Sequence, residues 1–228
     1  MKLTIVYDNE VYVQNEKLTP GWGFSCLIEA KGRKILFDTG WDGGVLVSNL
    51  ENLGHYPKNI DLIVLSHQHW DHIGGLNHIL DASSNIEVYV PKSFSRHLKN
   101  EIKSRAKLIE VSGGREICQD VYTTGEIGTK VVEQSMVIKT SKGFLVVTGC
   151  AHPGVEVILN EASKMGRVYG LIGGLHNFKQ LSLLKNLKLI VASHCTRYKN
   201  DISKAFPNSF EEGGVGKKIT IDEQYSSN

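Results

Sequence analysis

The sequence has few of the features that mark membrane, secreted or zinc-ribbon proteins. Four cysteines occur among 228 residues, and no two of them form a CxxC pair. This spacing argues against a disulfide framework and against a zinc ribbon. No apolar run approaches the length needed to cross a bilayer, and the segment MKLTIVYDNE has no apolar signal core. We therefore expect a soluble cytoplasmic protein with reduced thiols and no membrane partner.

An excess of charge of one sign is also absent. The 26 Lys and Arg residues nearly balance the 24 Asp and Glu residues, and the basic residues are dispersed along the chain. Binding to nucleic acid is therefore weakly supported. No Pro-rich or Ser-rich linker, low-complexity tract or repeat of solenoid length interrupts the chain. We expect one domain over residues 1–228, with fraying only at residues 222–228.

Short β-rich segments alternate with segments of helical period. Strands are predicted in KLTIVY, FSCLIEA, KILFDTG, IDLIVLS, IEVYVP and KLIEVSGG, and the clearest helix is GGVLVSNLENLG, bounded by glycines. After about residue 120 the pattern predicts two strands about a turn in SMVIKTSKGFLVVTG, a helix in VEVILNEASKMG, a strand in RVYGLIGG, a helix in FKQLSLLKNL and a strand in KLIVAS. The chain is therefore of the α/β class.

The densest group of metal-binding side chains lies in SHQHWDHIGG, residues 66–75, directly after the apolar run IDLIVL. His67 and His69 are two apart, so in extended chain they point the same way, while Asp71 and His72 would open the following helix. Imidazole and carboxylate ligands suit Zn²⁺, Fe or Mn²⁺, and such a site usually keeps an open position for water. The alternative is a polar loop whose histidines bind no metal.

Three further histidines directly follow predicted strands: His152, His176 and His194. Strand carboxyl ends in open α/β sheets are where ligand sites gather. We predict that His152 and His194 are metal ligands, and leave His176 open between a ligand, a substrate contact and a structural hydrogen bonder. Surface positions are predicted for the remaining histidines outside this group and the 66–75 segment, which are His55, His78 and His97.

On these motifs the chain resembles the metallo-β-lactamase superfamily, whose HxHxDH signature matches residues 67–72. The likeness is close for the family of 7,8-dihydropterin-6-methyl-4-(β-D-ribofuranosyl)aminobenzene 5'-phosphate synthases. The segments GFSCLIE, ILFDTG, LIVLSHQHWDHIGGL, VVTGCAHPG, LIGGLH and HCT occur in that order in this family. The resemblance implies a four-layer αβ/βα sandwich, in which two mixed sheets are flanked by helices and a metal pair lies at one edge.

The resemblance also implies how two divalent ions, most commonly Zn²⁺, would be held. His67 and His69 would join a third histidine on one ion. Asp71, His72 and His194 would hold the other.

This sequence departs from the usual superfamily pattern at the third histidine and at the bridging aspartate. It has no histidine between His97 and His152, and Cys150 stands about where the bridging aspartate is expected. We therefore predict that His152 completes the first ion's ligands, and leave Cys150 open between a thiolate ligand and a buried core thiol. With Asp71 as the only certain anionic ligand, the site would be unusually cationic and would favour anionic substrates, above all phosphate esters.

In the mechanism that the resemblance implies, a metal-bound hydroxide attacks an electrophilic carbon or phosphorus atom. Asp71 or His176 could move the proton. Asp38 in FDTG matches an aspartate that orients a metal-binding histidine, although an ordinary Asx turn before Gly40 explains it equally well.

Substrate contacts are less clearly marked. Aromatic residues on glycine-rich loops could stack on a planar ring or pack in the core; these are Trp22, Phe24 and Trp41. Arg197, Tyr198 and Lys199 could hold a phosphate or form a solvated basic turn.

The leading hypothesis is a dinuclear metal-dependent hydrolase of a small anionic, phosphorylated metabolite. The alternatives are a synthase of the pterin pathway type and a metal-containing binding or sensor protein without turnover. The identity of the substrate, the number of metal ions and the oligomeric state remain open at this point.

Overall fold

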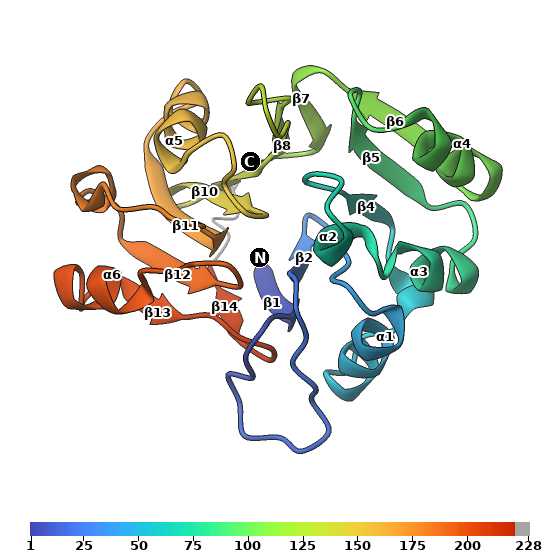
Figure 1. The fold of residues 1–228 in the computed structure, drawn as a ribbon, viewed down its shortest axis with the longest axis horizontal. Coiled ribbons are helices and arrows are strands. Elements are labelled where there is room, and N and C mark those ends of the chain that lie inside the picture. The colour runs from blue at the N-terminus through green and yellow to red at the C-terminus, as the bar shows by residue number, and fades with distance from the viewer. Residues whose placement is uncertain (222–228) are drawn as a thin grey trace, which may run out of the picture.

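Two mixed seven-stranded sheets face each other in the computed structural model of the protein, which describes residues 1–221 (Figure 1). In spatial order, the strands of the first sheet are β14 (Lys218–Thr220), β1 (Lys2–Tyr7), β2 (Ser25–Ala30), β3 (Arg33–Phe37), β4 (Leu62–Val64), β5 (Glu87–Pro91) and β6 (Lys107–Val111). Those of the second sheet are β13 (Phe210–Glu212), β12 (Leu189–Ser193), β11 (Val168–Gly174), β10 (Gly143–Thr148), β9 (Met136–Thr140), β8 (Val121–Gly125) and β7 (Gly113–Cys118).

Each sheet has an antiparallel half and a parallel half. Strands β1, β2 and β3 pair antiparallel, and β3 to β6 pair parallel. In the second sheet β7 to β10 pair antiparallel, and β10 to β13 pair parallel. Because parallel strands end at the same edge, the chain segments that follow β10, β11 and β12 become neighbours. The segment that follows β4 of the facing sheet lies against them, since His67 packs beside His152.

Helices cover the outer faces of both sheets (Figure 1). The first half contains α1 (Gly43–Asn52), the 3₁₀ turn η1 (Pro57–Asn59), α2 (Trp70–Ile73), α3 (Leu76–Ala82) and α4 (Arg96–Arg105). The second half contains α5 (Val155–Ser163), the 3₁₀ turn η2 (Leu181–Leu184) and α6 (Lys199–Ala205).

Three apolar layers follow from the period of two along each strand. In β4, Val64 joins the core between the two sheets, together with Val147 of β10. Its neighbour Ile63 faces the opposite way and packs with Leu46 of α1. Ile158 of α5 covers the outer face of the second sheet in the same manner. The four-layer sandwich is confirmed.

Helix α1 forms as its sequence predicts. Asp42 caps its amino end by accepting a hydrogen bond from the Val45 amide at 2.9 Å. Leu46, Asn49 and Leu50 are buried at the i, i+3 and i+4 positions. The Asn49 side chain also donates hydrogen bonds to the Val6 and Thr19 carbonyls, which fastens the segment between β1 and β2.

Two predictions of local structure are wrong. The segment 178–187 forms the short turn η2 and not a full helix. Its buried Leu184 and Leu187 pack in the outer core without a helix, since periodicity reports which side chains are buried and not which hydrogen bonds form. His55 is only 7% exposed, because the chain turns inward after α1, whereas His78 and His97 are exposed as predicted.

All four cysteines carry free thiols. Among residues 1–221, we find no helix with the length and apolar character that crossing a bilayer requires. The predicted fraying of residues 222–228 lies outside the described residues.

One glycine at the end of β11 tests how closely the parallel strands must pack. Gly173 has φ 119°, and a Cβ there would lie 1.9 Å from the Thr148 carbonyl oxygen of β10. Gly32 in the β2–β3 turn also has a positive φ, of 74°, but a Cβ there would meet nothing within 4 Å. We expect Gly32→Ala to cost about 1 kcal/mol of unfolding free energy, and Gly173→Ala at least about 3 kcal/mol. Equal losses in denaturant unfolding would contradict this close packing.

Candidate metal centre

The predicted ligands meet at the edge where the parallel strands of both sheets end. The histidine loop, residues 65–69, follows β4 and leads into α2. The Cys150 loop, residues 149–152, follows β10 of the other sheet. His176 follows β11 and His194 follows β12, and both have φ in the left-handed region, at 48° and 45°. The chain reverses sharply at these two positions, so each side chain stays at the strand end.

A first cluster contains the three histidines predicted for one ion. The rings of His67 and His69 are 4.6 Å apart, and both lie 4.8 Å from the ring of His152. The donor atoms of His67, Cys150 and His152 lie within 4.8 Å of one another. His152 therefore lies beside the two histidines with which it was predicted to share an ion.

A second cluster contains the residues predicted for the other ion. The donor atoms of His72, Cys150 and His194 also lie within 4.8 Å of one another. Asp71 Oδ2 is 3.2 Å from His194 Nε2 and 3.8 Å from His72 Nε2. Cys150 is thus common to both clusters, and its Sγ lies 3.1 Å from His72 Nε2.

The donor set fits a pair of metal ions. The Nε2 atom of His152 is buried without a hydrogen-bond partner among the described residues, which is costly unless a ligand occupies the space before it. Burial and the surrounding imidazoles lower the pKa of His67, and they lower that of His152 to about 4. Both rings are then neutral at pH 7, as metal binding requires. Imidazole, carboxylate and thiolate together suit Zn²⁺ and neighbouring transition metals.

Asp38 contacts one predicted ligand of the second cluster directly and one of the first cluster through Ser66. Its Oδ2 lies 2.7 Å from His72 Nδ1, and its carboxylate accepts hydrogen bonds from the Ser66 amide and hydroxyl. The Ser66 hydroxyl lies 2.8 Å from His67 Nδ1. Burial lowers the pKa of His72, but the Asp38 carboxylate outweighs this effect and raises it overall. Asp38 therefore orients one histidine directly and another through Ser66.

Sequence reasoning missed two residues that follow β1. Asn9 Oδ1 lies 2.8 Å from His194 Nδ1, and Asp8 Oδ2 accepts a hydrogen bond from the His194 amide at 3.0 Å. Burial raises the pKa of Asp8 to about 6. Polar residues directly after a buried strand are the same signal that identified the histidines, so the pair could have been found in the segment YDNE.

Glu133, between β8 and β9, was also missed. It is 1% exposed, and its carboxylate accepts hydrogen bonds from every amide of the Cys150 loop. Together with Asp8 and Asp38 it adds buried carboxylates around the ligands. The expectation of an unusually cationic site counted only the ligand Asp71 and understates the negative charge here.

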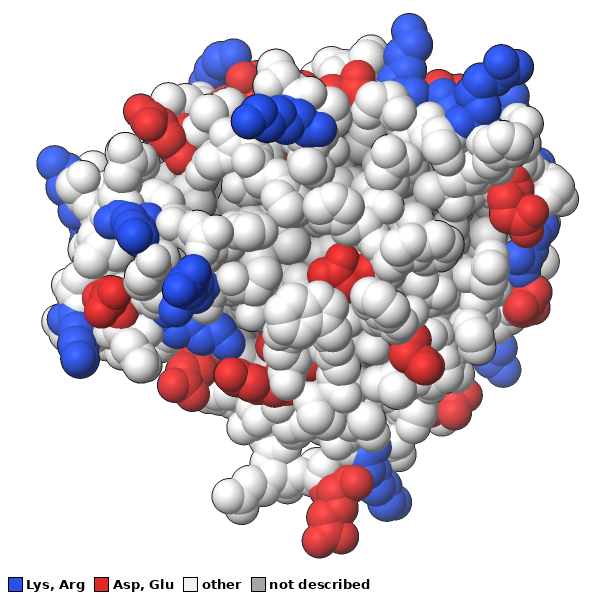
Figure 2. All heavy atoms as spheres, viewed as in Figure 1, with Lys and Arg blue, Asp and Glu red and all other residues white. Residues whose placement is uncertain are grey.

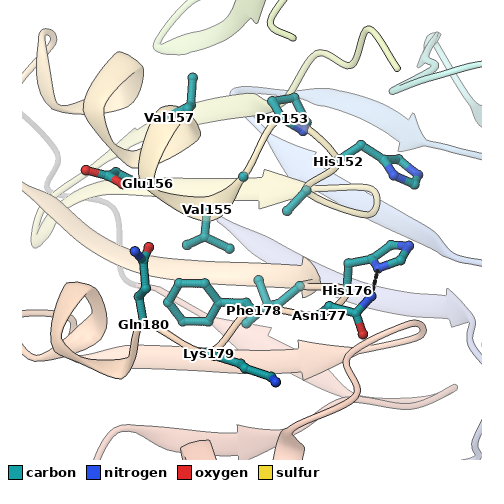
Figure 3. A pocket seen from close by; sticks show the side chains of 13 residues that line it. His152, Pro153, Val155, Glu156, Val157, His176, Asn177, Phe178, Lys179 and Gln180 are labelled. Carbon is teal, nitrogen blue, oxygen red and sulfur yellow. Dashed lines mark hydrogen bonds between the residues drawn. The ribbon is translucent and has the colours of Figure 1, made fainter. Parts of the chain in front are cut away.

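His176 lies beside the first cluster, at one end of a pocket. Its ring is 5.0 Å from that of His152, and its Nδ1 lies 3.1 Å from Asn177 Nδ2. The pocket has a volume of about 550 Å³ and is lined by residues 151–157 and 175–180. In Figure 3 the rings of His152 and His176 stand at one end, Val155 and Phe178 lie between, and Glu156 and Gln180 are at the other end. His176 is therefore placed to contact a molecule that reaches the first cluster.

The predicted substrate contacts divide into exposed and buried residues. Trp22 and Trp41 are 60% and 57% exposed, and the ring of Trp22 lies 5.4 Å from that of His194. Phe24 is fully buried in the core between the sheets, so of the two alternatives left open for it, core packing is the one found. Phe24 directly precedes β2, and its ring packs against that of Phe37.

The basic residues near His176 also differ from one another. Lys199 forms an ion pair with Glu10 at 3.1 Å. The cationic groups of Lys179 and Arg197 lie over the Tyr198 ring, at 5.0 Å and 5.9 Å from its centroid. Neither Lys179 nor Arg197 pairs with a carboxylate of residues 1–221, so both charges remain available to an anion.

Comparison with known proteins identifies a family and a relative. Residues 18–194 match the model of the metallo-beta-lactamase superfamily. The 7,8-dihydropterin-6-methyl-4-(beta-D-ribofuranosyl)-aminobenzene-5'-phosphate synthase of Methanocaldococcus jannaschii is 30% identical, over 88% of this chain and 91% of its own length.

Solved structures share the fold over nearly the whole chain. Tm1679, a metal-dependent hydrolase of the beta-lactamase superfamily, superposes with a TM-score of 0.79 at 24% identity, covering 98% of this chain and 100% of its own. The metallo-beta-lactamase fold protein YhfI of Bacillus subtilis gives a TM-score of 0.72 at 14% identity, covering 96% and 99%.

Removing one histidine tests the metal content. We expect protein purified without chelator to contain about two ions per chain, and His152→Ala to contain about one, because the first cluster loses a ligand that no neighbour replaces. Elemental analysis measures this directly, with the exposed His97→Ala as the matched control. One ion in all three proteins would contradict the ligand role of His152.

Lowered histidine pKa values predict a pH effect on the metal-free protein. The pKa of His152 falls from 6.5 to about 4 on folding. Between these values the unfolded chain binds a proton that the folded chain does not, so this histidine destabilises the fold as the pH falls. His152→Gln should therefore gain thermal stability relative to wild type between about pH 7 and about pH 5. The raised pKa values of His72 and Asp8 act in the opposite direction, but they are common to both proteins and cancel when the variant is compared with wild type. The control variant His97→Gln should show no such trend.

Proposed function

The chain belongs to the metallo-β-lactamase superfamily, and we propose that it is a metal-dependent hydrolase with a dinuclear centre that acts on a small anionic, phosphorylated metabolite. The convergence of two ligand clusters on Cys150 is the observation that carries this proposal. A protein that only bound a ligand would not need two adjacent sets of metal-binding side chains.

The first ion would be held by His67, His69 and His152. The second would be held by Asp71, His72 and His194, with Cys150 as a thiolate within reach of both. Bound there, the ions would supply Lewis acidity that activates water and polarises the electrophile.

His176 is the better candidate of the two proton carriers. Burial raises the pKa of Asp71, but the hydrogen bond from His194 and the charge of His72 outweigh this and lower it to about 2. A carboxylate of this pKa is a weak base near neutral pH and serves better as a ligand. The His176 ring faces the pocket beside His152, so it can accept or return a proton at the reacting group.

Two cations that pair with no carboxylate of residues 1–221 favour an anionic substrate. Lys179 lines the pocket next to His176, and the amide of Arg197 donates a hydrogen bond to the His176 carbonyl. Figure 2 shows few charged side chains near the middle of this face, while several Lys and Arg atoms lie at the left, over the side of α6 and β12, with Asp and Glu atoms among them. A phosphate group would therefore meet positive charge on the β12 side of the pocket.

A second candidate is a pterin-pathway synthase. The 30% identity to the Methanocaldococcus jannaschii enzyme, over most of both chains, favours it. A synthase would use the same metal centre for a different reaction.

Phosphoester turnover tests the proposed reaction. We expect the metal-loaded protein to hydrolyse aryl phosphomonoesters or diesters, and His176→Asn to lower kcat at least about 100-fold, because a general acid or base contributes that much. A neutral lactone or thioester hydrolysed faster than every phosphoester would contradict the anionic substrate class.

Charge reversal at the pocket tests substrate binding. Lys179→Glu should raise KM for a phosphoester about tenfold with little change in kcat, since Lys179 lies at the pocket and away from the ligands. Lys164→Glu, on the exposed end of α5, is the matched control. An unchanged KM in Lys179→Glu would place the phosphate elsewhere.

A further inference from the structure

The Glu133 carboxylate fills a nest of backbone amides beneath the candidate metal centre. Glu133 is 1% exposed, and its carboxylate accepts five hydrogen bonds of 2.9 to 3.1 Å. The donors are the Thr148 hydroxyl and the amides of Gly149, Cys150, Ala151 and His152. Consecutive amides that converge in this way form an anion site, and here a side chain of the same chain occupies it.

The Cys150 loop contains a strained residue at its centre. Ala151 has φ 56°, in the left-handed region that costs a residue with a Cβ. This reversal lies between Cys150 and His152, the two residues that reach the clusters. Such a conformation persists only where its surroundings hold it, and the Glu133 carboxylate binds the amides of Ala151 and of both its neighbours.

Gln134, the next residue, hydrogen-bonds to the histidine loop of the opposite sheet. The Gln134 amide donates a hydrogen bond to the Ser66 carbonyl at 2.9 Å, and its side-chain amide donates one to the Leu65 carbonyl at 2.8 Å. Residues 133 and 134 therefore hold the Cys150 loop and the histidine loop at once.

We propose that Glu133 is a positioning residue, an internal anion that holds Cys150 and His152 in the strained loop where they reach both metal clusters. This role rests on the proposed function, since it takes Cys150 and His152 as ligands. Glu133 itself faces the amides and makes no contact with a ligand side chain in the described residues. It therefore acts through the loop backbone.

Cobalt binding tests this role without an enzymatic assay. A thiolate ligand gives Co²⁺ an intense charge-transfer band. Because Cys195 Sγ lies 3.3 Å from Cys150 Sγ, the spectrum is recorded in a Cys195→Ser background, where the band reports whether Cys150 binds the ion. We expect Glu133→Gln to bind Co²⁺ about 10- to 100-fold more weakly and with a weaker band, because an amide cannot accept hydrogen bonds on both of its terminal atoms. Glu126→Gln is the matched control, because Glu126 accepts a single amide hydrogen bond, from Ser93, outside the loop.

Relief of backbone strain gives a second, independent readout. Glycine adopts the left-handed conformation freely, so Ala151→Gly in the Glu133→Gln background should recover Co²⁺ affinity by about fivefold. If Glu133→Gln alone does not fold, Glu133→Asp replaces it, with the same expected loss and the same rescue.

Two results would overturn the proposal. In the first, Glu133→Gln is less stable but binds Co²⁺ with wild-type affinity and band, which would leave only a structural role. In the second, the Cys195→Ser protein lacks the thiolate band and Ala151→Gly rescues nothing. Phosphoester turnover is measured separately, so a wild type with the expected cobalt spectra but no turnover would contradict the proposed reaction and not the role of Glu133.

Discussion

The candidate metal centre depends on the hydrogen bonds of one buried carboxylate, that of Asp38. It accepts hydrogen bonds from the amide and hydroxyl of Ser66 and contacts Nδ1 of His72, so it joins the end of β3 to the histidine loop and to α2. Gly149 of the other sheet packs against this group, and a Cβ there would lie 2.3 Å from the Ser66 hydroxyl and 3.0 Å from Asp38 Oδ2. A buried carboxylate is tolerated only when its donors are all in place, so these strand ends must meet in one arrangement.

The same principle extends around the centre, since the candidate ligands are held from behind by polar groups. His67 contacts Ser66, His194 contacts Asn9, and the amide of His152 binds Glu133. Each contact fixes a ring or its backbone before an ion arrives, which lowers the cost of organising the site. The carboxylates Asp8, Asp38 and Glu133 also compensate positive charge that Asp71 alone would leave unbalanced.

Most of the fold and much of the site could be predicted from the sequence, because the relevant signals are local. Buried strands appear as apolar runs, and the carboxyl-end rule for parallel strands placed His67, His152 and His194 at one edge. The errors arise where an apolar pattern is compatible with more than one backbone. Residues 178–187 bury leucines through a short turn and not through the predicted helix. Phe24, which the sequence left open between ring stacking and core packing, belongs to the core.

The sequence by itself determined which donor atoms exist and that they follow strands, since residue types and periodicity are written along the chain. Only the tertiary structure decided that Cys150 lies between both clusters and that Glu133 supports it. Cys150 contacts His72 across 78 positions, and Glu133 binds backbone amides, which every residue but proline possesses. A contact between distant segments, made to groups that all residues share, has no local pattern and forms only when the two sheets pack together.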